Sequence, residues 1–381
     1  MTTSARRIGD QIAIPMCLMR GGTSRGPMFR ASDLPRDLQV RDQVLLSVMG
    51  SPHPLQVDGV GGGHSLTSKA GIVAASEADG VELDFTFVQL QPETTTVQAT
   101  QNCGNMLAAV VPFAIESGLI HPTEDITDVV VRTANTGLIS RISVQTPELN
   151  GQRYVQYSGD AQIAGVAGSA SPVNIRFLNT AGSIASALLP TGNVTDVVVA
   201  DDTEYTVTLI DNGQPLVVLN AQALGVSGYE SVAELSKNAE LKKRVEALRL
   251  AAAHTMGLGD VTDDSYPKMT LVAPPRDGGA ISTRSFIPHR VHESIGVLAA
   301  VTVATALLLD GSVAAQVGVA GTGKQQTVRI EHPSGIFEAL VDLDDDGAVV
   351  ASGNTRTARL IGRGEAYVPA SIWDPSTAEN V

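Results

Sequence analysis

The chain has 381 residues, a formal net charge of −14 and 43% hydrophobic residues. This length exceeds what one hydrophobic core usually serves, so we expect two domains. The negative charge repels nucleic-acid backbones and anionic lipid surfaces, which argues against both as partners. Because there are only two cysteines and no apolar segment at the N-terminus, the sequence predicts a reduced cytoplasmic protein without a disulfide framework.

A series of elements follows the N-terminal segment in a fixed order. Residues 17–35 predict a strand, a tight polar turn and a second strand, and residues 38–50 predict a helix ending in Met-Gly. A Lys-led strand follows at 68–76. The segment 98–113, "QATQNCGNMLAAVVPF", then predicts a helix that starts directly after a polar cluster.

The second half of the chain repeats this order. Residues 208–225 match the hairpin, and residues 239–257 match the helix that ends in Met-Gly. "PKMTLVAPP" at 267–275 is the Lys-led strand, and "HRVHESIGVLAAVTVA" at 289–304 is the second helix start. The repeat therefore predicts an α+β fold built from two pseudo-symmetric halves.

We expect the first half to span residues 12–187 and the second half to span residues 188–354. The strand predicted at 355–368 is expected to return to the first half. Residues 1–11 and 369–381 are expected to be loose tails.

The repeat pairs Lys69 with Lys268 and Cys103 with Ser294. Two helix N-termini that face one cleft would form a cradle for a small polyanion, because each carries partial positive charge and free N–H groups. A helix N-terminus also favours the thiolate form of a cysteine, whereas serine is too weak an acid or base. Lys69 follows a glycine-rich loop that permits close approach to a ligand. We therefore expect Lys69 and Cys103 to be the acid and base groups.

Further residues around these motifs are candidate substrate contacts. They are Arg20, Gly21, Gly22, Thr23, Ser24, Thr67, Ser68, Asn102, Gly104, Asn105, Lys268, Arg284, His292 and Ser294. Arg20, Thr23 and Ser24 equally suit the bracing of a turn. His292 also suits a helix cap, and Arg284 also suits an exposed strand position.

Two other features are expected to be structural. Cys17 suits a small buried strand residue. The turn that begins at His332 suits a connection between strands.

Six motifs resemble one family of isomerases. They are "MRGGTSRG", "DGVGGGHSLTSK", "QNCGNM", "LPTGN", "PKMTLVAPP" and "EHPSG". They resemble the isomerases grouped with 2-methylaconitate cis-trans isomerase and 4-oxalomesaconate tautomerase, and the resemblance runs from Ile14 to Val368. It implies a fold similar to diaminopimelate epimerase: two alike domains, each a curved, barrel-like, mostly antiparallel sheet around a central helix, with the active site in the cleft between them. Ser294 departs from the two-cysteine pattern of the epimerases, which favours the isomerase branch over two-thiol racemisation.

The resemblance implies an allylic proton shift in an unsaturated tricarboxylate, without a metal or cofactor. The residues that match the family's acid and base groups are Lys69 and Cys103. The best match is a 4-oxalomesaconate tautomerase, and an isomerase of 2-methylaconitate or aconitate is the alternative. A non-catalytic protein that binds small acids on the same fold is an alternative of another class. A homodimer is left open.

Overall fold

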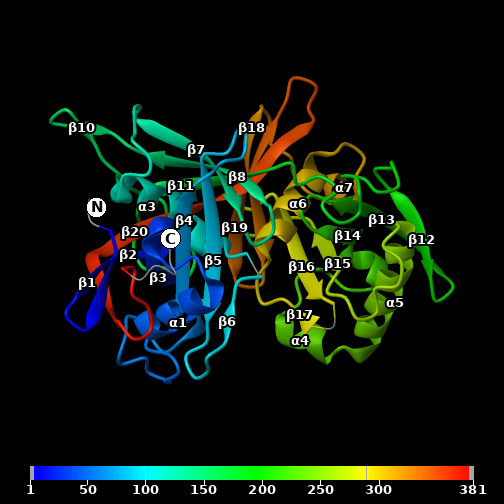
Figure 1. Cartoon of the computed structure of the whole chain (residues 1–381). Coiled ribbons are helices and arrows are strands. Elements are labelled where there is room, and N and C mark those ends of the chain that lie inside the picture. The colour runs from blue at the N-terminus through cyan, green and yellow to red at the C-terminus, as the bar shows by residue number, and fades with distance from the viewer. Residues whose placement is uncertain (1–3, 101, 289, 377–381) are drawn as a thin grey trace. The chain divides into compact units, whose positions relative to one another are not determined.

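The computed structural model describes residues 4–100, 102–288 and 290–376. Figure 1 shows its ribbon. The chain divides into two compact units. One contains the chain up to Ile175 and from Thr355 onward, and the other is Arg176–Asn354. The boundary lies inside strand β11 (Pro172–Leu178), before the expected end of the first half at residue 187.

In the described residues the first unit is a closed barrel. Its strands, in order around the barrel, are β2 (Gln11–Gly21), β3 (Ser24–Arg30), β4 (Lys69–Ala75), β5 (Leu83–Leu90), β7 (Ile126–Thr133), β8 (Ile139–Gln145), β11 and β20 (Val349–Pro369). Strand β20 pairs again with β2, which closes the ring. The pairs β3–β4 and β5–β7 are parallel because a helical crossover connects each of them.

Helices cover two faces of this barrel. Helix α1 (Leu38–Met49) packs on the outer face, where β2 and β4 contribute alternate residues. That buried cluster includes Val44, Leu45, Ile12, Ile14, Ala70 and Ile72. Residues of opposite parity point to the inner face: a Cβ on Gly21 would lie 3.2 Å from the Cβ of Ala109, beside the central helices. This alternation decides which side chains can share a site.

The single helix expected after Cys103 is two short helices. They are α2 (Gly104–Leu107) and α3 (Val110–Ser117). Pro112 explains the break, because a proline has no N–H and its ring clashes with the carbonyl four residues earlier. The matching helix of the second unit, α6 (Val297–Leu308), has Val303 at that position and is continuous.

The second unit follows the same order of elements. Its strands are β12 (Asp196–Ala200), β13 (Thr203–Asp211), β14 (Pro215–Asn220), β15 (Lys268–Ala273), β16 (Ile281–Ile287), β18 (Gln325–His332), β19 (Gly335–Leu343) and the first part of β20. The pairs β14–β15 and β16–β18 are again parallel. The predicted α+β fold with two alike halves is confirmed.

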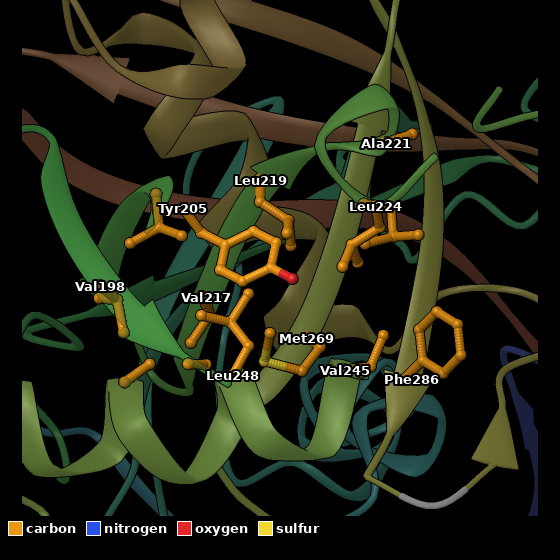
Figure 2. Close-up of a cluster of buried hydrophobic side chains, with 14 of the residues drawn as sticks. Val198, Tyr205, Val217, Leu219, Ala221, Leu224, Val245, Leu248, Met269 and Phe286 are labelled. Atoms are coloured by element: carbon orange, nitrogen blue, oxygen red, sulfur yellow. The ribbon is translucent and has the colours of Figure 1, made fainter. Parts of the chain in front are cut away.

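Helix α5 (Ala239–Thr255) covers the outer face of the second sheet. Its Leu241, Val245, Leu248 and Ala252 are all buried, as their helical spacing predicts. Figure 2 shows Val245 and Leu248 in one cluster with strand residues such as Val217, Leu219, Met269 and Phe286. Helix α6 lies against the opposite, inner face, where its buried residues pack with Leu216 and Val218.

The described parts of the two segments expected to be loose tails, residues 4–11 and 369–376, pack on the first unit, and the rest of both segments lies outside the described residues. Strand β1 (Arg6–Ile8) pairs antiparallel with β2, and Arg7 forms an ion pair with Asp374 at 2.5 Å. Trp373 is buried in the α1 cluster, and the N–H of Ala370 donates to the carbonyl oxygen of Asp10 at 2.9 Å. The burial of the indole ring explains why this end is held.

Shorter elements complete the described chain. They are η1 (Ala31–Asp33), η2 (Ser65–Thr67), β6 (Val97–Gln98), β9 (Glu148–Leu149), β10 (Gln152–Arg153), η3 (Ala221–Leu224), α4 (Val232–Lys237), β17 (Arg290–Val291) and α7 (Val313–Val317). Across the ranges that the structure describes, no helix combines the length and the apolar character needed to cross a bilayer.

Candidate functional site

Lys69 is the first residue of β4 and lies on the inner face of the first barrel. Its side chain shares this face with Gly71, whereas Ala70 and Ile72 point toward α1. The Nζ atom of Lys69 donates a hydrogen bond to Oε1 of Gln89 and lies 5.0 Å from the centroid of the Phe87 ring. The amine is thus held by an uncharged amide and not by a carboxylate.

The amide of Gln89 is itself fixed in orientation. Its Nε2 atom donates to the carbonyl oxygens of Ser65 and Ser68 at 3.1 Å and of Leu90 at 3.0 Å. These bonds turn Oε1 toward Lys69, which is the direct cross-strand partner of Gln89. The sequence did not point to Gln89, because its role depends on the register between β4 and β5.

Cys103 is the N-cap residue of α2. It is partly exposed, and its side chain makes no capping hydrogen bond. A Cβ on Gly104 would meet nothing within 4 Å, so there is open space at this helix start. Because α2 has only four residues, its dipole is smaller than that of the longer helix the sequence predicts.

The turn between β2 and β3 packs directly against this helix start. The Nδ2 atom of Asn105 donates to Oγ1 of Thr23 at 2.9 Å. A Cβ on Gly22, which has a φ of 51°, would lie 2.2 Å from Oδ1 of Asn105, so only glycine permits this approach. Ser24, also on the inner face, is buried and its Oγ has no hydrogen-bond partner in the described residues. These residues lie together beside Cys103.

Asn102 contributes to the same end of the unit. Its Nδ2 atom donates to Oγ1 of Thr136 at 2.6 Å, which ties the segment before α2 to the β7–β8 turn. This hydrogen bond holds the backbone of Asn102 next to Cys103 and occupies the side-chain amide of Asn102.

Arg20 does not share the face of Lys69. It has the parity of Ile12 and Ile14, which pack toward α1. Its Nη1 atom donates to the carbonyl oxygen of Gly22 at 2.8 Å and to the carbonyl and hydroxyl oxygens of Thr357 at 3.0 Å. The structure therefore supports the bracing of the turn rather than the expected substrate contact beside Lys69.

Thr67 and Ser68 are used inside the glycine-rich loop. Ser68 is fully buried, and its Oγ bonds to Oε1 of Gln56 at 2.8 Å and to the carbonyl oxygen of His64 at 2.9 Å. The hydroxyl of Thr67 donates to the same His64 carbonyl at 3.1 Å. Both residues hold the loop that leads into Lys69, and their contact with substrate stays a prediction.

The second unit gathers polar groups at the N-terminus of α6. Lys268, the first residue of β15, donates from Nζ to Oε1 of Gln214 at 3.1 Å. A Cβ on Gly296, the N-cap of α6, would lie 4.0 Å from this Nζ. Burial lowers the pKa of Lys268 below its ordinary value.

Two histidines and Ser294 complete this cluster. The N–H of Ser294 donates to Nδ1 of His292 at 2.9 Å, and the N–H of Ser334 donates to Nδ1 of His332 at 3.2 Å. Each Nδ1 is thus an acceptor, so each neutral ring carries its hydrogen on Nε2. His332 Nε2 lies 3.4 Å from Oγ of Ser294 and can donate to it, which leaves the serine hydrogen for another acceptor. His332 was expected to be structural only.

The groups around α6 are mainly donors and cations, which suits an anion. Burial, followed by the positive charge of Lys268, lowers the pKa of His292. Burial, followed by His292 and Arg284, lowers the pKa of His332. Within the described ranges, no three histidine, cysteine or carboxylate groups gather as metal ligands.

Arg284 lies on the other face of the second sheet. It has the parity of Phe286, which packs in the cluster under α5. Its Nε donates to the carbonyl oxygen of Glu230 at 2.6 Å, and its Nη1 donates to that of Thr283 at 2.8 Å. Arg284 therefore braces the segment before α4, and its contact with substrate stays a prediction.

The lowered pKa values of His292 and His332 predict a loss of stability in acid. Below about pH 6.5 the unfolded chain binds protons on these rings that the folded chain resists, so the free energy of unfolding falls as the pH falls toward the folded pKa values. We expect a variant with both His292→Gln and His332→Gln to lose less stability between pH 7.5 and 5.5 than the wild type. Urea unfolding at the two pH values measures this, and equal losses in both proteins would refute it.

Comparison with known proteins identifies the family to which the chain is similar. The model of the family described as "PrpF protein" matches residues 11–369. The chain is 50% identical over 363 residues to the (4E)-oxalomesaconate Delta-isomerase of Novosphingobium sp. (strain KA1), covering 95% of this chain and 99% of that protein. It is 46% identical over 363 residues to the 4-oxalomesaconate tautomerase of Pseudomonas putida, covering 95% and 98%.

One solved structure is also similar along the whole length. The crystal structure of methylitaconate-delta-isomerase superposes with a TM-score of 0.86 at 30% sequence identity. The match covers 97% of this chain and 99% of that chain.

Proposed function

The chain belongs to the PrpF protein family and is an isomerase, and from this we propose that its substrate is 4-oxalomesaconate, an unsaturated tricarboxylate. The relatives at 50% and 46% identity are both named for this acid. The structural observation that supports this chemistry is the amine of Lys69 on the inner face, which the uncharged amide of Gln89 holds in place. Such an amine is suited to move a proton.

The substrate's name describes mesaconate, a methyl-substituted fumarate, with an oxalo group on its methyl carbon. The methylene at this carbon therefore lies between a carbon–carbon double bond and a keto group, so its protons are acidic. Removal of one proton by the Lys69 amine leaves a dienolate. Return of the proton to the keto oxygen gives the enol, and return to the far alkene carbon gives the double-bond isomer. One base thus serves both activities named for the relatives, and no atom is gained or lost.

We assign a supporting role to Cys103. Its thiol lies at the start of α2, beside the Gly22–Thr23 turn and open space. There it would donate to the oxygen of the dienolate or return the second proton, which stabilises the developing charge.

We assign carboxylate binding to the cluster of the second unit. Lys268, His292 and Ser294 supply an ammonium, an Nε2–H and a hydroxyl donor around the N-terminus of α6. These donors suit the substrate's negative charges. That both clusters act on one substrate in a shared cleft stays a prediction from the sequence, as do a cytoplasmic location and a homodimer.

A panel of acids tests the substrate. We expect kcat/KM for 4-oxalomesaconate to exceed the values for 2-methylaconitate, 3-methylitaconate and aconitate by at least about a hundredfold, because only the first has a methylene activated by a keto group. Ultraviolet absorbance of the conjugated products follows each reaction. A higher kcat/KM for any of the other three acids would assign the enzyme to that substrate instead.

Gln89 offers a test of how Lys69 is held. A carboxylate beside an amine favours the ammonium form, so Gln89→Glu should weaken the base at neutral pH. We expect kcat at pH 7 to fall by about tenfold or more, and steady-state kinetics measure this loss.

The second unit provides the matched control for this variant. Gln214 makes the same contact with Lys268. Gln214→Glu should lower kcat much less than Gln89→Glu does. Unchanged kcat for Gln89→Glu, or an equal loss for Gln214→Glu, would show that Lys69 is not the base.

A further inference from the structure

Three arginines lie side by side on neighbouring strands of the first barrel. Arg20 on β2 is the direct cross-strand partner of Arg25 on β3 and of Arg359 on β20. Directly opposite residues of a sheet share one face, and like charges at such positions destabilise each other. Burial, followed by the charge of Arg359, lowers the pKa of Arg20.

In the described part of the chain, no carboxylate forms an ion pair with any of these three arginines. The Nη1 atom of Arg20 is bonded to backbone and hydroxyl oxygens only. The Nε atom of Arg25 is buried and has no hydrogen-bond partner among the described residues. The protein has a net charge of −14, yet these neighbouring cations have no anionic partner in the described residues, which favours the binding of an anion here.

A cavity lies directly beside two of the three. It has a volume of about 530 Å³ and is lined by Arg20 and Arg359 together with the polar side chains of Tyr157, Ser158 and Ser169. The other lining residues are glycine, alanine and valine, and none is acidic. This volume is within the range of about 300–1,000 Å³ that is typical of small-molecule sites.

We propose that this cavity binds a small polycarboxylate whose carboxylate groups pair with Arg20 and Arg359. The planar guanidinium fork matches a carboxylate with two parallel hydrogen bonds. Two adjacent arginines favour a ligand with more than one carboxylate, and the apolar lining accommodates its carbon skeleton. The site is distinct from that of Lys69, because Arg20 and Lys69 point to opposite faces of the sheet.

Chemical protection of arginine tests the proposal on the full-length protein. Phenylglyoxal modifies accessible guanidinium groups, and peptide mass spectrometry gives the modification rate at each arginine. The probe is tricarballylate, a saturated tricarboxylate that no allylic proton shift can consume. We expect tricarballylate to slow the modification of exposed Arg359 by about fivefold or more. Exposed Arg141 on β8 is the internal control and should react at an unchanged rate.

Two further measurements are needed. One distinguishes binding in this cavity from binding beside Lys69, and the other distinguishes it from unspecific attraction of anions. Protection of Arg359 should persist in the Lys69→Met protein, because Lys69 lies on the other face. Inorganic phosphate at the same concentration should protect Arg359 much less than tricarballylate does. Unchanged modification of Arg359, equal protection of Arg141, loss of protection in Lys69→Met, or equal protection by phosphate would each overturn the proposal.

Discussion

Replacement of Lys69 by methionine is expected to reduce kcat/KM by about a hundredfold to ten-thousandfold, the usual contribution of a positioned acid or base. Methionine keeps a stem of similar length beside Phe87 but removes the amine that abstracts the proton. Gln89 loses one hydrogen-bond partner, which costs about 1 kcal/mol of stability and leaves the fold intact. Initial rates with 4-oxalomesaconate measure the effect, and thermal unfolding confirms the fold.

Lys268→Met is the matched control. Lys268 occupies the corresponding position at the start of β15, and burial lowers its pKa, so it is the strongest competitor for the role of base. We expect this variant to raise KM, because Lys268 is assigned to carboxylate binding, and to keep most of kcat. If Lys268→Met lost kcat while Lys69→Met kept it, the two roles would be reversed.

Replacement of Cys103 by serine is expected to lower kcat by about a hundredfold. A hydroxyl is a far weaker acid than a thiol and transfers a proton poorly at neutral pH. The fold should survive, because Cys103 makes no capping hydrogen bond and Ser294 occupies the matching position of the second unit. Steady-state kinetics and thermal unfolding measure both expectations.

Cys17→Ala controls for the loss of a thiol as such. Cys17 is fully buried in β2, and burial raises the pKa of its thiol, so it stays protonated and takes no part in proton transfer. We expect its removal to affect stability rather than kcat. A Cys103→Ser enzyme with wild-type turnover would exclude the thiol from the proton transfers.

Local patterns in the sequence predicted the repeated elements well. The apolar spacing of α5 gave its buried face, and Lys69 and Lys268 each begin the strand expected of them. The order of hairpin, helix and Lys-led strand recurs because each half forms the same barrel-like unit. The family resemblance carried by the quoted motifs is also confirmed.

Local sequence patterns could not predict the contacts between strands that lie far apart in the sequence. Gln89 and His332 are placed by the pairing of β4 with β5 and of β16 with β18, which no local motif reveals. Arg20 and Arg284 were grouped with the site because of neighbouring motifs, although strand alternation turns them to the opposite faces. Pro112 was visible in the sequence and could have predicted the break between α2 and α3.

Proton exchange at the methylene between the double bond and the keto group tests the proposed role of Lys69 most directly. The measurement is proton NMR of 4-oxalomesaconate in heavy water with wild-type enzyme, with Lys69→Met enzyme and without enzyme. We expect wild type to place deuterium at the exchanging carbon during isomerisation, because the protons of the Lys69 amine exchange with solvent. Lys69→Met should stay at the background rate measured without enzyme. Binding of the acid by wild type without conversion or deuterium uptake would contradict the proposed proton transfer and indicate a non-catalytic binding protein.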